Sequence, residues 1–475
     1  MIKLEIVNGS LQVSYNGSII LVVPKNSCAI DVLALYDAIP FIVIYNKYLG
    51  NSTVVFNQPL ANCEDGTSTP FTVNGFIAFA ETNLGFDTSG GGGGSSPFRY
   101  DTNASGIEPC LGSNNASGVY STIGGGSGNI ACYPCSTVGG GRDNNANNYY
   151  STIGGGVNNN SANFASTIGG GNANFALGGC STVGGGSSNT ASGEKATISG
   201  GYFNNATGCS STIGGGVCNN ASGSSSTIGG GNTNTINPSQ QSGVFPFIGD
   251  VINGGCDNVI NTNTYSTYNA TGGNVIGGGC NNIVTAYANG FSTIGGGRNN
   301  IACRDSSTIG GGYSNVSCGS GSTVGGGCNN NASGSNSTIG GGFNNNASGY
   351  CSTIGGGSTN SATNTWSTIG GGAYNVASNY SSTVVGGKNN IASGQCSSIL
   401  GGGYNIASGD TSSILGGFYN NTNTCADAII VGSNITADRA CATFVNNLSI
   451  KDIPTSSAGL PSGSVWSNSG VLTIV

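Results

Sequence analysis

Histidine is absent from the 475-residue sequence, and charged side chains make up only 6% of it. Without histidine, neither a Ser/His/Asp nor a Cys/His nucleophile can be assembled, and every histidine metal site is excluded. Eleven basic residues stand against eighteen acidic ones, so the chain has no positive field for nucleic acid or an anionic bilayer. We therefore predict that the protein is not an enzyme, holds no metal or other cofactor, and does not bind nucleic acid.

Long apolar runs are also missing from the sequence. The longest, from Val32 to Tyr45, is too short to span a bilayer and is broken by Asp37 and Pro40. Glu5 stands where a secretion signal would begin its apolar core. We expect a soluble chain that folds in a cytoplasm and does not insert into a membrane.

The seventeen cysteines do not form a metal-binding pattern. Only Cys132 and Cys135 have the CxxC spacing, and no second pair accompanies them. Their odd number and the length of the chain also argue against a disulfide scaffold. We expect most cysteines to be small buried hydrophobic residues.

Glycine is abundant instead, with 88 residues, and most belong to one repeated phrase. The stretch STIGGGVCNNASGSSSTIGGG (Ser211 to Gly231) returns to its opening hexad after fifteen residues. We number the repeat from position 0, the first residue of the hexad, to position 14. Position 2 is Ile or Val in every hexad, which predicts one buried row per coil. That structural row is Ile123, Val138, Ile153, Ile168, Val183, Ile198, Ile213, Ile228, Ile294, Ile309, Val324, Ile339, Ile354, Ile369, Val384, Ile399, Ile414 and Ile429.

The repeat predicts an all-β fold. The glycine content and the lack of a 3.6-residue period exclude a helix. We expect a three-residue STI strand with Ile inward and Ser and Thr outward, a corner at GGG, and a second corner at the two asparagines before Ala-Ser, which are Asn219 and Asn220 in the quoted stretch. Position 10 is usually Ala, which permits close packing. Each repeat is then one coil of an elongated β-solenoid or β-roll.

One Ile and one Ala per coil make a thin core. Such a coil gains a few kcal/mol at about 25 cal/mol per Å2 of buried apolar area, whereas ordering costs about 1 to 2 kcal/mol per residue. Three chains that pool their isoleucine rows around one axis would have a larger core. The sequence thus predicts a homotrimer, with intertwined or side-by-side chains.

STIGGG followed by NNxASG resembles the repeats of fibre proteins of tailed phages and large algal viruses, from Ser121 to about Asn447. It is also similar to the SVAIG-type repeats of trimeric autotransporter adhesin heads, which are left-handed β-rolls of three chains. The C-terminal stretch from Phe444 to Val475 resembles the ends of viral fibre and tail-associated proteins, where it forms a β-rich cap. The resemblance implies a virion-surface rod, assembled in the host cytoplasm, that contributes to attachment to a host surface glycan or protein.

Composition then divides the chain into six parts. We expect a β-rich attachment domain that binds other virion proteins, a glycine-rich linker leading into the repeats, a first repeat block, an irregular insertion, a second repeat block and a C-terminal β cap. Their bounds are 1–88, 89–120, 121–231, 232–291, 292–447 and 448–475.

The irregular insertion collects aromatic residues, which suit glycan or protein recognition. Loops that enter a solenoid project from one side, so the insertion is a candidate receptor-binding bulge; a packed knob or a kink in the rod is the plainer alternative. The aromatic residues are Phe245, Phe247, Tyr265, Tyr268, Tyr287 and Phe291.

Three other functions stay open at this point. A polysaccharide-degrading spike needs paired carboxylates, for which Asp250 and Asp257 are the candidates. Ice binding needs outward threonines, which position 1 supplies as a single row from Thr122 to Thr383. A bacterial surface adhesin would need a secretion signal and a membrane anchor, which the sequence does not display.

Overall fold

The computed structural model describes residues 113–237, 249–262, 272–286, 290–449, 453–468 and 471–474, together with isolated strands nearer the N-terminus. Those strands form antiparallel pairs. They are β1 (Ile2–Val7), β2 (Ser10–Tyr15), β3 (Ser18–Val23), β4 (Phe41–Asn46), β5 (Asn51–Phe56), β6 (Leu60–Ala61), β7 (Pro70–Phe71), β8 (Phe98–Tyr100) and β9 (Ile107–Pro109).

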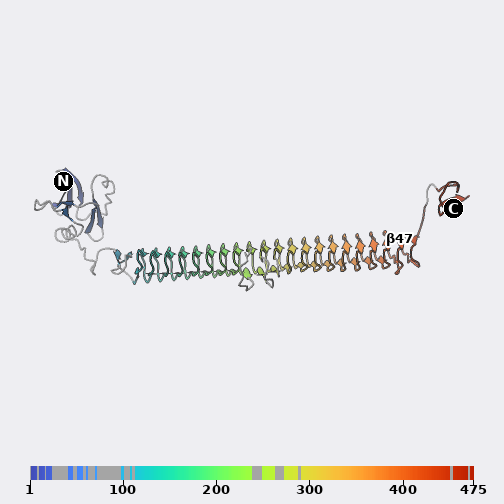
Figure 1. Cartoon of the computed structure of the whole chain (residues 1–475), viewed down its shortest axis with the longest axis horizontal. Helices are drawn as coiled ribbons and strands as arrows, with labels where there is room; N and C mark the ends of the chain where they lie inside the picture. Colours follow the sequence, from blue (N-terminus) through green and yellow to red (C-terminus); the bar gives the residue numbers. More distant parts are fainter. Residues whose placement is uncertain are drawn as a thin grey trace.

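The repeats form a parallel β-solenoid, seen as a long rod of stacked coils in Figure 1. The described residues of the rod contain no helix, and most coils give one two-residue strand to each of two parallel sheets. A third ladder of single-residue bridges joins position 6 of successive coils, as between Val157 and Asn172. Twenty coils at about 4.8 Å each give a rod of about 100 Å.

The first sheet is built from positions 1 and 2. Its strands are β10 (Thr122–Ile123), β12 (Thr137–Val138), β14 (Thr152–Ile153), β16 (Thr167–Ile168), β18 (Thr182–Val183), β20 (Thr197–Ile198), β22 (Thr212–Ile213), β24 (Thr227–Ile228), β26 (Val251–Ile252), β28 (Val275–Ile276), β30 (Thr293–Ile294), β32 (Thr308–Ile309), β34 (Thr323–Val324), β36 (Thr338–Ile339), β38 (Thr353–Ile354), β40 (Thr368–Ile369), β42 (Thr383–Val384), β44 (Ser398–Ile399), β46 (Ser413–Ile414), β47 (Ile429–Val431) and β48 (Thr443–Val445).

The second sheet is built from positions 9 and 10. Its strands are β11 (Ile130–Ala131), β13 (Asn145–Ala146), β15 (Asn160–Ser161), β17 (Phe175–Ala176), β19 (Thr190–Ala191), β21 (Asn205–Ala206), β23 (Asn220–Ala221), β25 (Thr235–Asn237), β27 (Val259–Thr262), β29 (Ile283–Ala286), β31 (Ile301–Ala302), β33 (Val316–Ser317), β35 (Asn331–Ala332), β37 (Asn346–Ala347), β39 (Ser361–Ala362), β41 (Val376–Ala377), β43 (Ile391–Ala392) and β45 (Ile406–Ala407). A C-terminal hairpin, β49 (Val465–Asn468) with β50 (Val471–Ile474), is antiparallel.

Four positions of each coil face the interior. Position 2 carries Ile or Val, position 10 carries mostly Ala, position 8 carries Asn and position 0 carries mostly Ser, and all four are buried. Serine at position 0 therefore points inward, not outward as the STI pattern suggested, because the strand covers only positions 1 and 2. In several coils its hydroxyl caps the preceding turn, as when Ser136 Oγ donates to the carbonyl of Tyr133 at 2.6 Å.

The expected row at position 2 needs one correction. Ile414 pairs with Ile430 rather than with Ile429, and Ile430 is fully buried while Ile429 is exposed. The coil before β47 is one residue longer than the regular fifteen-residue coils. A shift of one residue moves a strand side chain to the opposite face of the sheet. The other expected members of the row, from Ile123 to Ile414, have no exposed surface.

The isoleucine row has no surface left to share with other chains. Every side chain at position 2 from Ile123 to Ile430 lies at 0% exposure inside a single chain, in one cluster with the small residues of position 10. The predicted pooling of these rows from three chains around one axis does not fit this burial, because one chain already covers its own row.

The three corners of the coil use left-handed residues. They fall at position 5, always Gly in the regular coils, and at positions 7 and 14, where many residue types occur. In the coil that begins at Ser211, Gly216, Cys218 and Ser225 have φ of 91°, 55° and 56°. The expected turn at Asn219 and Asn220 is therefore one residue out of place: Asn219 is buried and Asn220 lies in β23.

The glycine corner gives a matched prediction. Gly312 has φ of 95°, and a Cβ there would meet the carbonyl oxygen of Gly327 and Asn315 Nδ2, whereas a Cβ at Gly311 would meet nothing within 4 Å. We expect Gly312→Ala to lower the free energy of unfolding by about 2 kcal/mol or more and Gly311→Ala to change it by less than about 0.5 kcal/mol. Denaturant titration of both variants checks this, and equal losses would contradict the assignment of the corner to position 5.

The irregular segment from Asn232 to Phe291 does not interrupt the rod. Both sheets pass through it, from β24 to β30 and from β23 to β31. In the sequence, the extra residues follow β25, β27 and β29, in three successive coils. Among the predicted bulge residues, Phe291 lies at position 14 and is half exposed. The others fall outside the described residues: Phe245, Phe247, Tyr265, Tyr268 and Tyr287.

Candidate functional site: the asparagine ladder and the outward ridges

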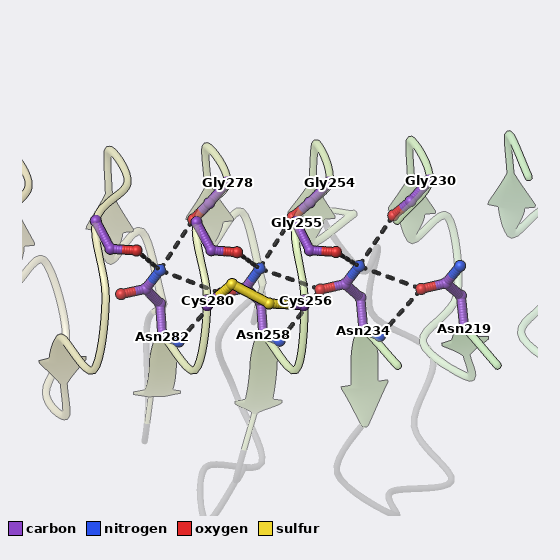
Figure 2. The surroundings of a disulfide bond; sticks show 12 residues. Asn219, Gly230, Asn234, Gly254, Gly255, Cys256, Asn258, Gly278, Cys280 and Asn282 are labelled. Carbon is purple, nitrogen blue, oxygen red and sulfur yellow. Dashed lines mark hydrogen bonds between the residues drawn. A yellow bond between two sulfur atoms is a disulfide. The ribbon is translucent and has the colours of Figure 1, made fainter. Parts of the chain in front are cut away.

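A row of twenty asparagines at position 8 runs along the inside of the rod (Figure 2). Asn234 donates from Nδ2 to the carbonyls of Gly230 at 2.9 Å and Gly255 at 3.0 Å. Its Oδ1 accepts from the backbone N–H and the Nδ2 of Asn258, both at 3.1 Å. This pattern recurs from coil to coil, so each buried amide is satisfied and ties the glycine corner of its own coil to the next coil. The members are Asn114, Asn129, Asn144, Asn159, Asn174, Asn189, Asn204, Asn219, Asn234, Asn258, Asn282, Asn300, Asn315, Asn330, Asn345, Asn360, Asn375, Asn390, Asn405 and Asn420.

Sequence reasoning missed this row although a signal was available. Position 7 varies, with Cys218 and Tyr374 as examples, whereas position 8 is Asn even in the irregular coils, at Asn258 and Asn282. A turn would tolerate Gly, Asp or Ser at position 8. A position that accepts only Asn needs both amide donors and the amide oxygen.

The cysteines differ from the expectation. None of the cysteines in the described part of the chain is buried; ten are free and either partly or fully exposed. Cys256 and Cys280 form a disulfide between adjacent coils at position 6 (Figure 2), with Cα atoms 4.6 Å apart. Cys303 and Cys318 form a second one at position 11. In a solenoid, cysteines at the same position of neighbouring coils lie close enough to form a disulfide. The number and spacing of cysteines in the sequence do not reveal this proximity.

The two carboxylates that were candidates for hydrolysis are not a pair. Asp250 is buried at position 0, where it replaces the usual serine, whereas Asp257 is exposed at the left-handed position 7 of the same coil. Asp250 accepts from Thr262 Oγ1 at 2.8 Å and from the N–H and Nδ2 of Asn274, both at 2.9 Å. Asp250 therefore has a structural role, and the geometry does not support the polysaccharide-degrading spike.

Burial raises the pKa of the Asp250 carboxyl above its ordinary value of 3.8, against the opposing hydrogen bonds from Asn274 and Thr262. A raised pKa in the folded state means that protonation favours folding. Stability from this group is therefore highest below the unfolded pKa and is lost as the pH rises through the folded pKa. We expect Asp250→Asn to be more stable than the unmodified chain, by a margin that grows with pH and then levels off. Thermal unfolding from about pH 3 to pH 8 measures this; Asp257→Asn is the control, and a margin independent of pH would contradict it.

The outward face of the first sheet carries threonine at position 1. The row runs in register from Thr122 to Thr227 and from Thr293 to Thr383, and Val251 and Val275 interrupt it. In the last coils, position 3 changes from glycine to apolar residues that are about half exposed. These are Val385, Leu400, Leu415, Val431 and Val445, which we call the apolar stripe.

Charges on the rod are few and exposed. Glu194 and Lys195 form an ion pair at 3.0 Å at one corner, and Arg142 with Asp143 forms another at 3.6 Å. Both pairs are more than half exposed, and such pairs contribute little to stability. Among the described residues, no cluster of three or more potential ligands could hold a metal ion.

Exposed aromatic residues gather at the corner formed by positions 12 to 14, which we call the aromatic corner. Tyr150 and Phe164 meet edge to face at 5.6 Å between ring centroids. Trp366 and Tyr380 do the same at 5.1 Å with 67° between the ring planes, and Tyr350 lies one coil before Trp366. A second set lies at positions 6 and 7, where Tyr404 and Tyr419 stack.

These features define the protein as a parallel β-solenoid of about twenty fifteen-residue coils. No protein-family model matches the sequence, and no curated protein is significantly similar to it. In the part of the chain that the structure describes, no helix is long and apolar enough to cross a bilayer.

Proposed function

We propose that this chain is the structural rod of a virion fibre or appendage, which extends from the particle and contributes to attachment to a host. The observation that carries the proposal is the unbroken stacking of about twenty coils in two continuous parallel sheets. Such a rod sets a distance and resists bending, because its ladders and the asparagine row join every coil to the next. The proposed localisation is the virion surface, and the proposed partners are other virion proteins at the N-terminal part and a host glycan or protein.

Antibodies raised against the purified rod test this function. We expect them to label intact particles purified from the source at a fixed distance outside the particle surface, by immunogold electron microscopy. Labelling that is confined to the surface of cells, with none on particles, would overturn the virion assignment in favour of a cellular adhesin.

The homotrimer is part of the same proposal, and we propose that the three chains contact one another through the outer surface of the rod. The isoleucine row is closed within one chain, so association would use exposed apolar surface such as Leu400 and Leu415 of the apolar stripe. Light scattering is expected to give three chain masses for the full chain and one for Leu400→Gly with Leu415→Gly, which restores the usual residue of position 3. A mass of one chain of 46.6 kDa before any substitution would reject the trimer.

Ice binding is a second candidate because the outward threonines stand in register along the first sheet. A regular spacing of hydroxyl and methyl groups could match the spacing of water molecules on an ice surface. The row is single and interrupted, which ranks this function below the first. Thermal hysteresis of the purified chain at micromolar concentration would reverse the order, whereas its absence would remove ice binding.

A further inference from the structure

The aromatic corner around Trp366 contains bulky side chains that the fold does not require. Position 14 is left-handed in the regular fifteen-residue coils, two of which place Ser306 and Ser381 there with φ of 57° and 50°. Trp366 adopts the same conformation, with φ of 57°, although bulky side chains disfavour it. Its ring does not belong to the buried core, since 49% of the residue is exposed. A conformational cost at a residue that stays half exposed points to a role outside folding.

The backbone segments that carry the rings are joined to one another along the rod axis, and the rings of Trp366 and Tyr380 meet edge to face. The backbone N–H of Trp366 donates to the carbonyl of Tyr350 at 2.9 Å, and that of Ser381 donates to Thr365 at 3.0 Å, so consecutive corners are tied together. Tyr350, Trp366 and Tyr380 lie in three successive coils and span about 10 Å. A rigid aromatic surface loses little conformational entropy when it binds a ligand.

The surroundings of the three rings are neutral and polar. No charged residue occurs between Asp305 and Lys388, which includes the coils on both sides of the cluster. Asn364 and Asn379 precede the rings in the same turns; each accepts from the next backbone N–H through Oδ1 and donates from Nδ2 to a carbonyl of the following coil. The surface thus offers aromatic faces together with hydroxyl, amide and carbonyl groups, without a charge to select an ionic partner.

We propose that Tyr350, Trp366 and Tyr380 form a binding site for a neutral glycan chain, which lies along the aromatic corner parallel to the rod. The apolar C–H faces of sugar rings pack on aromatic faces, and sugar hydroxyls that face away from a convex corner remain in water. The absence of charge matches a neutral polysaccharide and does not match a sulfated or uronic-acid polymer. This inference rests on the proposed role in host attachment and names the class of partner.

Fluorescence of Trp366 provides the test, because the chain has only two tryptophans and Trp466→Phe leaves Trp366 alone. The full chain with this substitution is titrated with soluble glucan, mannan and galactan oligosaccharides and with dextran sulfate. We expect a saturable change in emission with at least one neutral glycan and none with the polyanion. Failure of all three neutral glycans, or binding of the polyanion alone, would overturn the inference.

Matched variants locate the site by affinity chromatography on the glycan that binds. Trp366→Ser with Tyr380→Gln introduces the residues that position 14 holds at Ser381 and position 13 holds at Gln395, and we expect at least tenfold weaker binding. Tyr374→Asn removes an exposed aromatic residue from positions 6 and 7, where Asn389 is the matched residue, and is expected to bind normally. Glycan binding by the double variant equal to that of the unmodified chain would reject the glycan site. A change in the molar mass of the double variant would also reject it, because a second copy of the chain would then be the occupant of the aromatic corner. Particle labelling without glycan binding leaves the proposed function standing and rejects only this inference.

Discussion

Asn219→Asp is expected to lower the free energy of unfolding of the surrounding coils by about 3 kcal/mol or more. Asparagine and aspartate have nearly the same shape, so the change removes donors without creating a cavity. The carbonyls of Gly215 and Gly231, which accept from Asn219 Nδ2 at 2.9 and 3.1 Å, lose their donor. A carboxylate at a position with no exposed surface also carries the cost of burying a charge.

Hydrogen exchange followed by mass spectrometry is the appropriate measurement for this variant. A solenoid opens locally, so loss of protection is expected in β22 and β23 and in the neighbouring coils rather than along the whole rod. Asn220→Asp is the control, since Asn220 points outward in the next position of the same coil. Similar loss of protection in both variants would show that charge alone, and not the ladder, explains the effect.

The second large effect is expected for Ile213→Ala. The side chain is fully buried between β20 and β24, and removal of three carbons from a close-packed core costs about 2 to 5 kcal/mol. Thr212→Ala, the outward neighbour in β22, should change stability by less than about 0.5 kcal/mol. Denaturant titration of the two variants compares them directly.

The same pair of variants separates a core within one chain from a core shared between chains. If each chain buries its own row, Ile213→Ala weakens folding without changing the molar mass of the folded species in light scattering. If the row lined an axis between chains, the variant would dissociate at denaturant concentrations where its coils remain folded. Dissociation before unfolding would therefore contradict the single-chain core.

The sequence predicted the architecture well where one residue type repeats with a clear physical reason. The Ile or Val at position 2 and the glycine at position 5 identified strands, corners and the solenoid itself. The error at Ile429 arose because one added residue shifted the repeat, and a hydrophobic residue at both Ile429 and Ile430 concealed the shift. Only the pairing with Ile414 distinguishes the two.

The interior was harder to predict than the strands. Asn at position 8 reads as a turn residue in one repeat, and only the stack of coils shows that each side chain contacts the equivalent residue of the next coil. The two disulfides between neighbouring coils could not be predicted from the sequence for the same reason. The size of the core was underestimated because the sequence does not show that positions 0, 2, 8 and 10 all point inward.

The asparagine ladder has a direction that bears on how the rod is made. Each Oδ1 accepts from the coil that follows in the chain, and at the last rung Asn420 Oδ1 accepts from the backbone N–H of Ile435. A coil that has left the ribosome therefore already displays the acceptor that the next coil needs. Synthesis proceeds from the N-terminus, so each completed coil is a template for the one after it, and winding can keep pace with translation without waiting for distant parts of the chain.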